Sequence, residues 1–146
     1  MIPKNFKDSE TGRFILAWLC AVALMVALMM LIGAITRLTE SGLSMVEWRP
    51  LIGVLPPLSE AEWSRIFNLY RQTSEYRLEN AGMPISEFKT IFWWEYIHRL
   101  WGRLIGLVFA VPLAWFLWCG YIPKPLKPHL FILLCLGGLQ GIIGWW

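Results

Sequence analysis

The chain has 146 residues, of which 57% are hydrophobic and 16% charged, and its formal net charge is +3. This excess of apolar residues over the composition of typical soluble domains indicates a membrane protein. A nucleic-acid-binding domain would gather basic residues on one soluble face, and this composition indicates no such face, so we expect no nucleic-acid partner.

The first apolar segment, residues 14–35, contains neither a charge nor a proline. About 20 apolar residues in a helix cross a hydrocarbon core roughly 30 Å thick. A cleaved signal peptide has a shorter apolar stretch, of about 7–15 residues. The segment therefore predicts an uncleaved transmembrane helix in contact with membrane lipid.

Residues 36–90 connect this segment to the next apolar one, and they are not featureless. Ser59 and Glu62 have the spacing of a capping box at the start of a helix. Apolar residues then recur at helical spacing, namely Trp63, Ile66, Phe67 and Tyr70. The pattern predicts an amphipathic helix in the loop. Further on, Ser86 is a candidate N-cap for the helix of the second span.

Two further apolar segments predict transmembrane helices at about residues 91–121 and 126–146. The N-terminal tail and the short connection before the third span are basic, whereas acidic residues outnumber basic ones in residues 36–90. By the positive-inside rule, the N-terminus is cytoplasmic and residues 36–90 form an outer loop. The sequence thus predicts an all-α, multi-pass integral membrane protein with three transmembrane helices.

Several polar and small residues of the second span fall on one face of the predicted helix. Glu95, His98, Gly102 and Gly106 form a narrow stripe, and Arg99 borders it. A histidine that faces the interior of a helix bundle is a candidate axial ligand of heme iron. Glycines one turn along leave room for a flat macrocycle, and a carboxylate one turn away is placed for proton transfer.

Structural roles also explain the same residues from spacing alone. A helical histidine near an interface often only makes a packing hydrogen bond. Glu95 and Arg99 have the i,i+4 spacing of a stabilising ion pair. Gly102 and Gly106 form a GxxxG motif that brings helices close together. Both explanations therefore stay open at this point.

Two arginines are candidates for binding heme propionates, because a guanidinium binds a carboxylate through two parallel hydrogen bonds. Arg103 lies on the second span and Arg37 lies at the outer end of the first. An interfacial arginine without a ligand is the alternative for each. The remaining histidine, His129, is expected to be solvated in the short connection.

Longer motifs, at residues 33–44, 47–50, 53–58, 88–89, 91–96, 98–99 and 102–103, resemble those of the heme A synthases. The similarity is to the proteobacterial and mitochondrial branch and extends over nearly the whole chain. The resemblance implies a fold of eight transmembrane helices in two similar four-helix halves, each holding a heme between paired histidines. It implies that this chain provides three transmembrane helices of the first four-helix half-bundle.

The resemblance also implies an activity, the oxidation of a ring methyl of heme O to the formyl group of heme A for terminal oxidase biogenesis. Glu95 would be the catalytic residue and His98 an axial iron ligand of heme b. The candidates that the spacing and chemistry of the residues give for lining the cofactor site are Arg37, Arg99, Arg103, Gly102 and Gly106. The alternative is a non-catalytic heme-binding or assembly module of the membrane. Because the partner histidine would come from a fourth helix, we expect the isolated 146-residue chain, as a fragment, to be inactive.

Further expectations follow from the same resemblance. Candidate partners are heme O and heme A, heme O synthase, an electron donor and a second copy of the protein. The expected location is the bacterial inner membrane, or the mitochondrial inner membrane for a eukaryotic protein.

Overall fold

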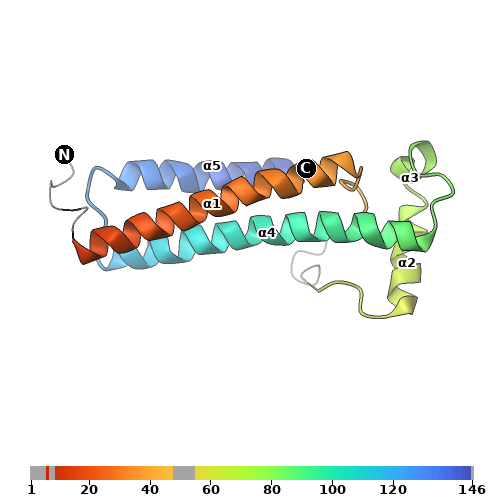
Figure 1. The fold of residues 1–146 in the computed structure, drawn as a ribbon, viewed down its shortest axis with the longest axis horizontal. Helices are drawn as coiled ribbons and strands as arrows, with labels where there is room; N and C mark the ends of the chain where they lie inside the picture. Colours follow the sequence, from red (N-terminus) through yellow and green to blue (C-terminus); the bar gives the residue numbers. More distant parts are fainter. Residues whose placement is uncertain (1–5, 7–8, 48–54, 146) are drawn as a thin grey trace. The chain divides into compact units, whose positions relative to one another are not determined.

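A computed structural model describes residue 6, residues 9–47 and residues 55–145, with the backbone alone at residue 145. Lys4 and Lys7 of the basic tail, motif residues 48–50 and 53–54, and the last residue of the third predicted span lie outside the described residues. The described chain contains helices only (Figure 1): α1 (Glu10–Leu38), α2 (Glu60–Tyr70), α3 (Ser74–Leu78), α4 (Ile85–Trp118) and α5 (Lys127–Trp145).

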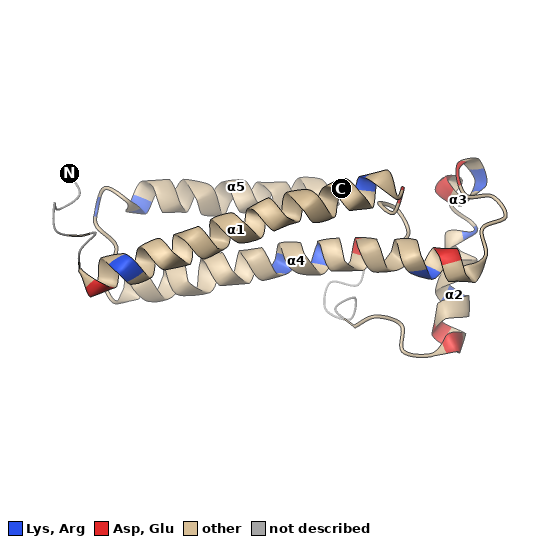
Figure 2. Cartoon of the chain, viewed as in Figure 1, with Lys and Arg blue, Asp and Glu red and all other residues tan. Residues whose placement is uncertain are grey.

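Three of these helices, α1, α4 and α5, are long and apolar enough to cross a membrane. The prediction of an all-α membrane protein with three transmembrane helices is therefore confirmed. Figure 2 shows α1 as an uncharged ribbon between its two charged ends. Glu10 lies in its first turn and Arg37 in its last turn, where each charge complements the helix dipole. These polar ends explain why α1 extends beyond the apolar residues 14–35.

The second span differs from its prediction at both ends. Helix α4 begins at Ile85, so Ser86 lies inside its first turn and the prediction of an N-cap at Ser86 is wrong. The helix ends at Trp118 because Gly120 takes a left-handed conformation, with φ of 71°. The Gly120 and Tyr121 amides donate to the carbonyls of Leu117 and Phe116, 3.2 and 2.9 Å away. This is the Schellman motif, which closes a helix by satisfying its last carbonyls.

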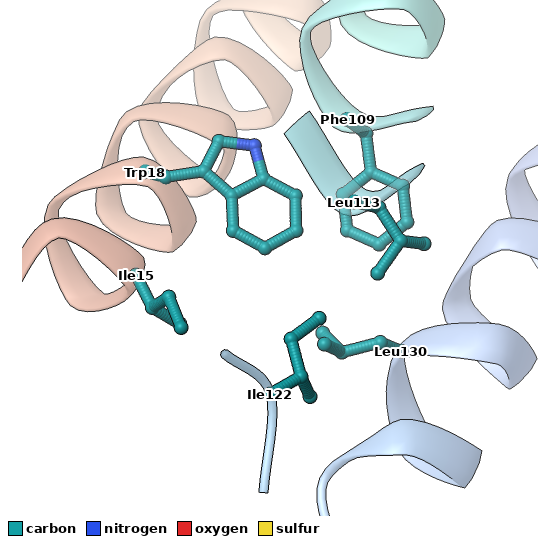
Figure 3. Packing of buried hydrophobic residues seen from close by; sticks show 6 residues of the cluster. All are labelled: Ile15, Trp18, Phe109, Leu113, Ile122 and Leu130. Carbon is teal, nitrogen blue, oxygen red and sulfur yellow. The ribbon is translucent and has the colours of Figure 1, made fainter. Parts of the chain in front are cut away.

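The described chain divides into two compact units, of which the first comprises residues 1–28 and 102–146. Its core holds side chains from α1, α4, α5 and the connection between α4 and α5 (Figure 3): Ile15, Trp18, Phe109, Leu113, Ile122 and Leu130. The Trp18 ring stacks on Phe109 with centroids 5.3 Å apart. The Trp18 indole N–H also donates to the carbonyl of Val108 at 2.7 Å. Both apolar packing and a hydrogen bond between α1 and α4 therefore hold this unit together.

The second unit comprises residues 29–101. An aromatic cluster packs α2 onto the first turns of α4, with buried side chains at Trp63, Tyr70, Phe88, Ile91, Phe92 and Tyr96. Helix α2 is amphipathic, as predicted: Trp63 and Tyr70 are buried, and Ser59 caps the helix by accepting a hydrogen bond from the Glu62 amide at 3.2 Å. Burial raises the pKa of Tyr70, whose hydroxyl accepts a hydrogen bond from Asn80 at 2.9 Å. The short helix α3 was not predicted.

Candidate functional site

Helix α4 carries Glu95, His98 and Arg99 within about one turn, in the second compact unit. Only 2% of Glu95 is exposed. An ionised carboxylate so far from water is tolerated only when it is paired and hydrogen-bonded. The surroundings of Glu95 therefore decide what this residue can do.

Three donors surround the Glu95 carboxylate. The Arg99 guanidinium donates to Oε1 and forms the predicted i,i+4 ion pair. The Ser44 hydroxyl and the Met45 amide donate to Oε2 at 2.7 and 2.8 Å. A hydrogen bond to a charged group contributes about 1.5–3 kcal/mol. Glu95 is therefore more than a partner of Arg99, because it fastens the segment after α1 to α4.

The end of α1 turns the chain towards Glu95. Glu40 has a φ of 51°, in the left-handed region that glycine usually fills. The Glu40 amide donates to the Arg37 carbonyl at 3.2 Å, and the Ser41 amide donates to the Thr36 carbonyl at 2.9 Å. This Schellman motif is followed by two fully buried serines, Ser41 and Ser44. A non-glycine residue in the left-handed region and two buried hydroxyls indicate a segment that is fixed in one conformation.

His98 lies one turn after Glu95 and is half-buried. Within the described part of the chain, its ring makes no hydrogen bond. Gly33 of α1 faces the ring: a Cβ placed on Gly33 would lie 3.4 Å from Nε2 and 3.9 Å from Cδ2 of His98. An imidazole whose nitrogens are not used by the protein, beside a position without a side chain, fits an axial ligand of heme iron.

The described residues contain no group of three or more His, Cys, Asp or Glu side chains that could enclose a metal ion. A heme takes four ligands from its own macrocycle and only the axial ones from protein. The donor set of this unit therefore fits a heme better than a metal ion held by side chains alone.

Known proteins resemble this chain over most of its length. The profile of a family described as cytochrome oxidase assembly protein matches residues 16–146. The chain belongs to this family. It is 53% identical over 134 residues to a heme A synthase of Rhodopseudomonas palustris strain BisA53, covering 92% of this chain and 37% of the relative. It is 57% identical over 129 residues to a heme A synthase of Bradyrhizobium sp. strain ORS 278, covering 88% of this chain and 36% of the relative.

A heme A synthase of Bradyrhizobium diazoefficiens is 54% identical over 138 residues, which cover 94% of this chain and 38% of the relative. This member of the family thus spans little more than a third of the length of these curated relatives. No solved structure matches the chain.

The other predicted site residues lie on α1 and α4. Arg37 is exposed in the last turn of α1, in the second unit. Gly102, Arg103 and Gly106 follow His98 on α4 but belong to the first unit. A Cβ on Gly106 would meet no atom within 4 Å, so its own unit gives no packing reason for this glycine. Within the second unit, the structure groups Glu95, His98 and Arg99 of the predicted set on one turn of α4.

Two residues of the site were missed by sequence reasoning, Ser44 and Gly33. Both lie inside the motif at residues 33–44 that resembles the heme A synthases. The motif therefore indicated this segment, but it did not indicate which residues of α4 these two would contact. His129 is exposed on α5, with Nδ1 3.0 Å from the Pro125 carbonyl. It is thus exposed, as predicted, but it lies in the first turn of α5 rather than in the connection before that helix.

Proposed function

We propose that the chain provides the heme-binding and reacting face of a heme A synthase, which oxidises a ring methyl of heme O to the formyl group of heme A. The observation that carries the proposal is the pairing, one turn apart on α4, of a buried carboxylate with an imidazole that makes no hydrogen bond to the described residues. The names of the relatives, all heme A synthases, support the same reaction.

In this proposal each candidate residue has a separate role. His98 binds the iron of heme b, which supplies the redox chemistry when bound. Glu95, held by Ser44, Met45 and Arg99, takes up or releases a proton, or stabilises positive charge, beside the reacting group. Arg37, Arg99 and Arg103 are candidates for the propionates, and Gly102 and Gly106 for the close approach of the macrocycle.

The overall chemistry sets what the partners must supply. Each hydroxylation places one oxygen atom in a C–H bond of the methyl group, and a second hydroxylation gives a geminal diol that loses water to leave the formyl group. If the oxygen atoms come from O₂, each round also takes two electrons and two protons and releases one water. We therefore include an electron donor among the partners, together with heme O synthase as the source of substrate and a second copy of the protein.

We place the protein in the bacterial inner membrane with a cytoplasmic N-terminus. The relatives are bacterial, and the basic tail and connection favour this orientation. The loop that contains α2 then lies on the outer side. The second candidate function, a non-catalytic heme-binding assembly module, is favoured by the description of the family as cytochrome oxidase assembly protein.

One experiment separates the two functions. The complete protein is produced in cells that make heme O but lack their own heme A synthase, and the extracted hemes are separated and quantified. We expect heme A from the wild type and little or none from His98→Ala, whose membrane fraction should also lose the spectrum of the heme bound at His98. His129→Ala is the matched control and should keep both. A wild-type protein that binds heme but yields no heme A would favour the assembly module.

A further inference from the structure

Gly33, on α1, faces the imidazole of His98. A Cβ built on Gly33 would lie 3.4 Å from Nε2, nearer than to Cδ2 at 3.9 Å, and no other atom of the described residues outside its own helix would lie within 4 Å. Both residues belong to the same compact unit, residues 29–101. A side chain at position 33 would therefore point at Nε2 of His98.

The fold itself does not require glycine at this position. A separation of 3.4 Å is ordinary van der Waals contact, so an alanine methyl would fit against the ring. Gly33 lies inside α1, with helical conformation on both sides, where alanine is the better helix former. Alanine at position 33 would therefore be compatible with the packing of α1 against α4. Some requirement other than helix packing must explain why this residue is glycine.

The nitrogen beside Gly33 supplies that reason. A neutral imidazole ligates a metal through the lone pair of Nε2 or Nδ1, and the ligating nitrogen must be free of other contacts. A methyl group resting on Nε2 would occupy the space that a flat macrocycle needs next to its iron. We propose that Gly33 is a positioning residue, which keeps the space beside Nε2 of His98 open for the iron of a heme. This inference rests on the proposed function of His98.

The argument predicts that Gly33→Ala separates folding from heme binding. The variant should reach the membrane in normal amount and unfold at no lower temperature than the wild type. Its affinity for heme at the His98 site should fall about tenfold or more, as expected when one methyl group is added to a filled pocket. The Soret band and the midpoint potential of the heme that does bind should shift, since the iron–nitrogen contact is changed.

The measurement is heme titration of the complete protein, purified in detergent without its heme, followed by absorbance and redox titration. Gly137→Ala is the matched control, because Gly137 is also a glycine within an apolar helix and a Cβ there would meet nothing within 4 Å. It should leave affinity and spectrum unchanged.

Each remaining outcome would overturn the proposal. Unchanged affinity and spectrum in Gly33→Ala would show that the space beside Nε2 is not used, and equal losses in Gly137→Ala would show a general effect of added bulk. Poor accumulation of Gly33→Ala would show that the fold itself needs the glycine. If His98→Ala loses its heme while Gly33→Ala keeps it, only the role of Gly33 fails. If His98→Ala keeps its heme, the proposed function fails.

Discussion

The hydroxyl of Ser44 donates a hydrogen bond of 2.7 Å to Oε2 of Glu95, a residue 51 positions later in the chain. Ser44 also lies 3.3 Å from the carbonyl of Ser41. A serine hydroxyl both donates and accepts. Ser44 can therefore donate to an ionised Glu95, or accept from a protonated Glu95 while it donates to the Ser41 carbonyl. This arrangement keeps a partner for Glu95 in both protonation states.

Ser44→Ala should test this relationship. The variant leaves Oε2 of a buried carboxylate with the Met45 amide alone, and a lost hydrogen bond to a charged group costs about 1.5–3 kcal/mol. We expect the free energy of unfolding to fall by this amount and the heme A yield to fall with it, while the heme bound at His98 stays. Ser86→Ala removes an exposed serine of α4 and should change neither quantity. Unchanged stability and yield in Ser44→Ala would show that the bond contributes nothing.

Glu95→Gln separates the chemical role of the carboxylate from its role in packing. All three groups around the carboxylate are donors, whereas a glutamine amide replaces one acceptor oxygen by an N–H₂ group with two donor hydrogens. The amide oxygen can keep Ser44 and Met45 only if the amide N–H₂ faces Arg99, so we expect a modest loss of stability. We also expect retained heme and about 10²–10⁴-fold less heme A, the usual effect of losing an acid–base group.

The measurement for Glu95→Gln is heme A yield at equal membrane abundance, with bound heme quantified in the same samples. Near-normal heme A formation would return Glu95 to a structural role, that of fastening the segment after α1 to α4. An equal fall in bound heme and in heme A would indicate that the carboxylate acts through the site's structure rather than through the reaction.

The sequence predicts the features of this fold that depend on neighbouring residues. The uncharged run within α1 and the Ser59 cap of α2 are local patterns, and both are present in the structure. Helix α3 has a local signal too, since Thr73 caps it by accepting from the Tyr76 amide at 3.2 Å, but five residues give no apolar period. The contacts of Ser44 with Glu95 and of Gly33 with His98 join distant segments, and no spacing rule within one helix contains them.

The orientation in the membrane is a further prediction from charge. Reporter fusions at Glu79, in the long loop, and at Lys124, in the basic connection between α4 and α5, should lie on opposite sides of the membrane. Alkaline phosphatase should be active at Glu79 and inactive at Lys124 if residues 36–90 lie outside. Fusion of a cytoplasmic reporter at the same positions is the reciprocal control. Equal activity at both positions would contradict the proposed topology.

The last prediction concerns Trp18 and the proline of α4. Pro112 lies inside the helix and has no N–H, so the carbonyl of Val108, four residues earlier, lacks its usual helical donor. The Trp18 indole N–H fills this place at 2.7 Å. In a membrane an unsatisfied carbonyl cannot turn to water, and neighbouring helices commonly supply the missing donor. Proline and tryptophan should therefore be energetically coupled.

A double-mutant cycle measures this coupling. Trp18→Phe keeps an aromatic ring next to Phe109 but removes the N–H, and should lower the free energy of unfolding by about 0.6–1.7 kcal/mol, the range for hydrogen bonds between membrane helices. Pro112→Ala restores a backbone N–H that can reach Val108. Trp18→Phe should therefore cost clearly less in the Pro112→Ala background. The free energies come from denaturant unfolding of the complete protein in detergent.

The control for the cycle is Trp115→Phe, which removes an indole N–H from a tryptophan of α4 that is 58% exposed. It should cost the same small amount with either residue at position 112. Strictly additive losses for Trp18→Phe and Pro112→Ala would mean that the Val108 carbonyl finds another donor when Trp18 is absent. A coupling free energy of the predicted size and sign would instead show that Trp18 compensates for the proline, and that the two residues stabilise the first unit as a pair.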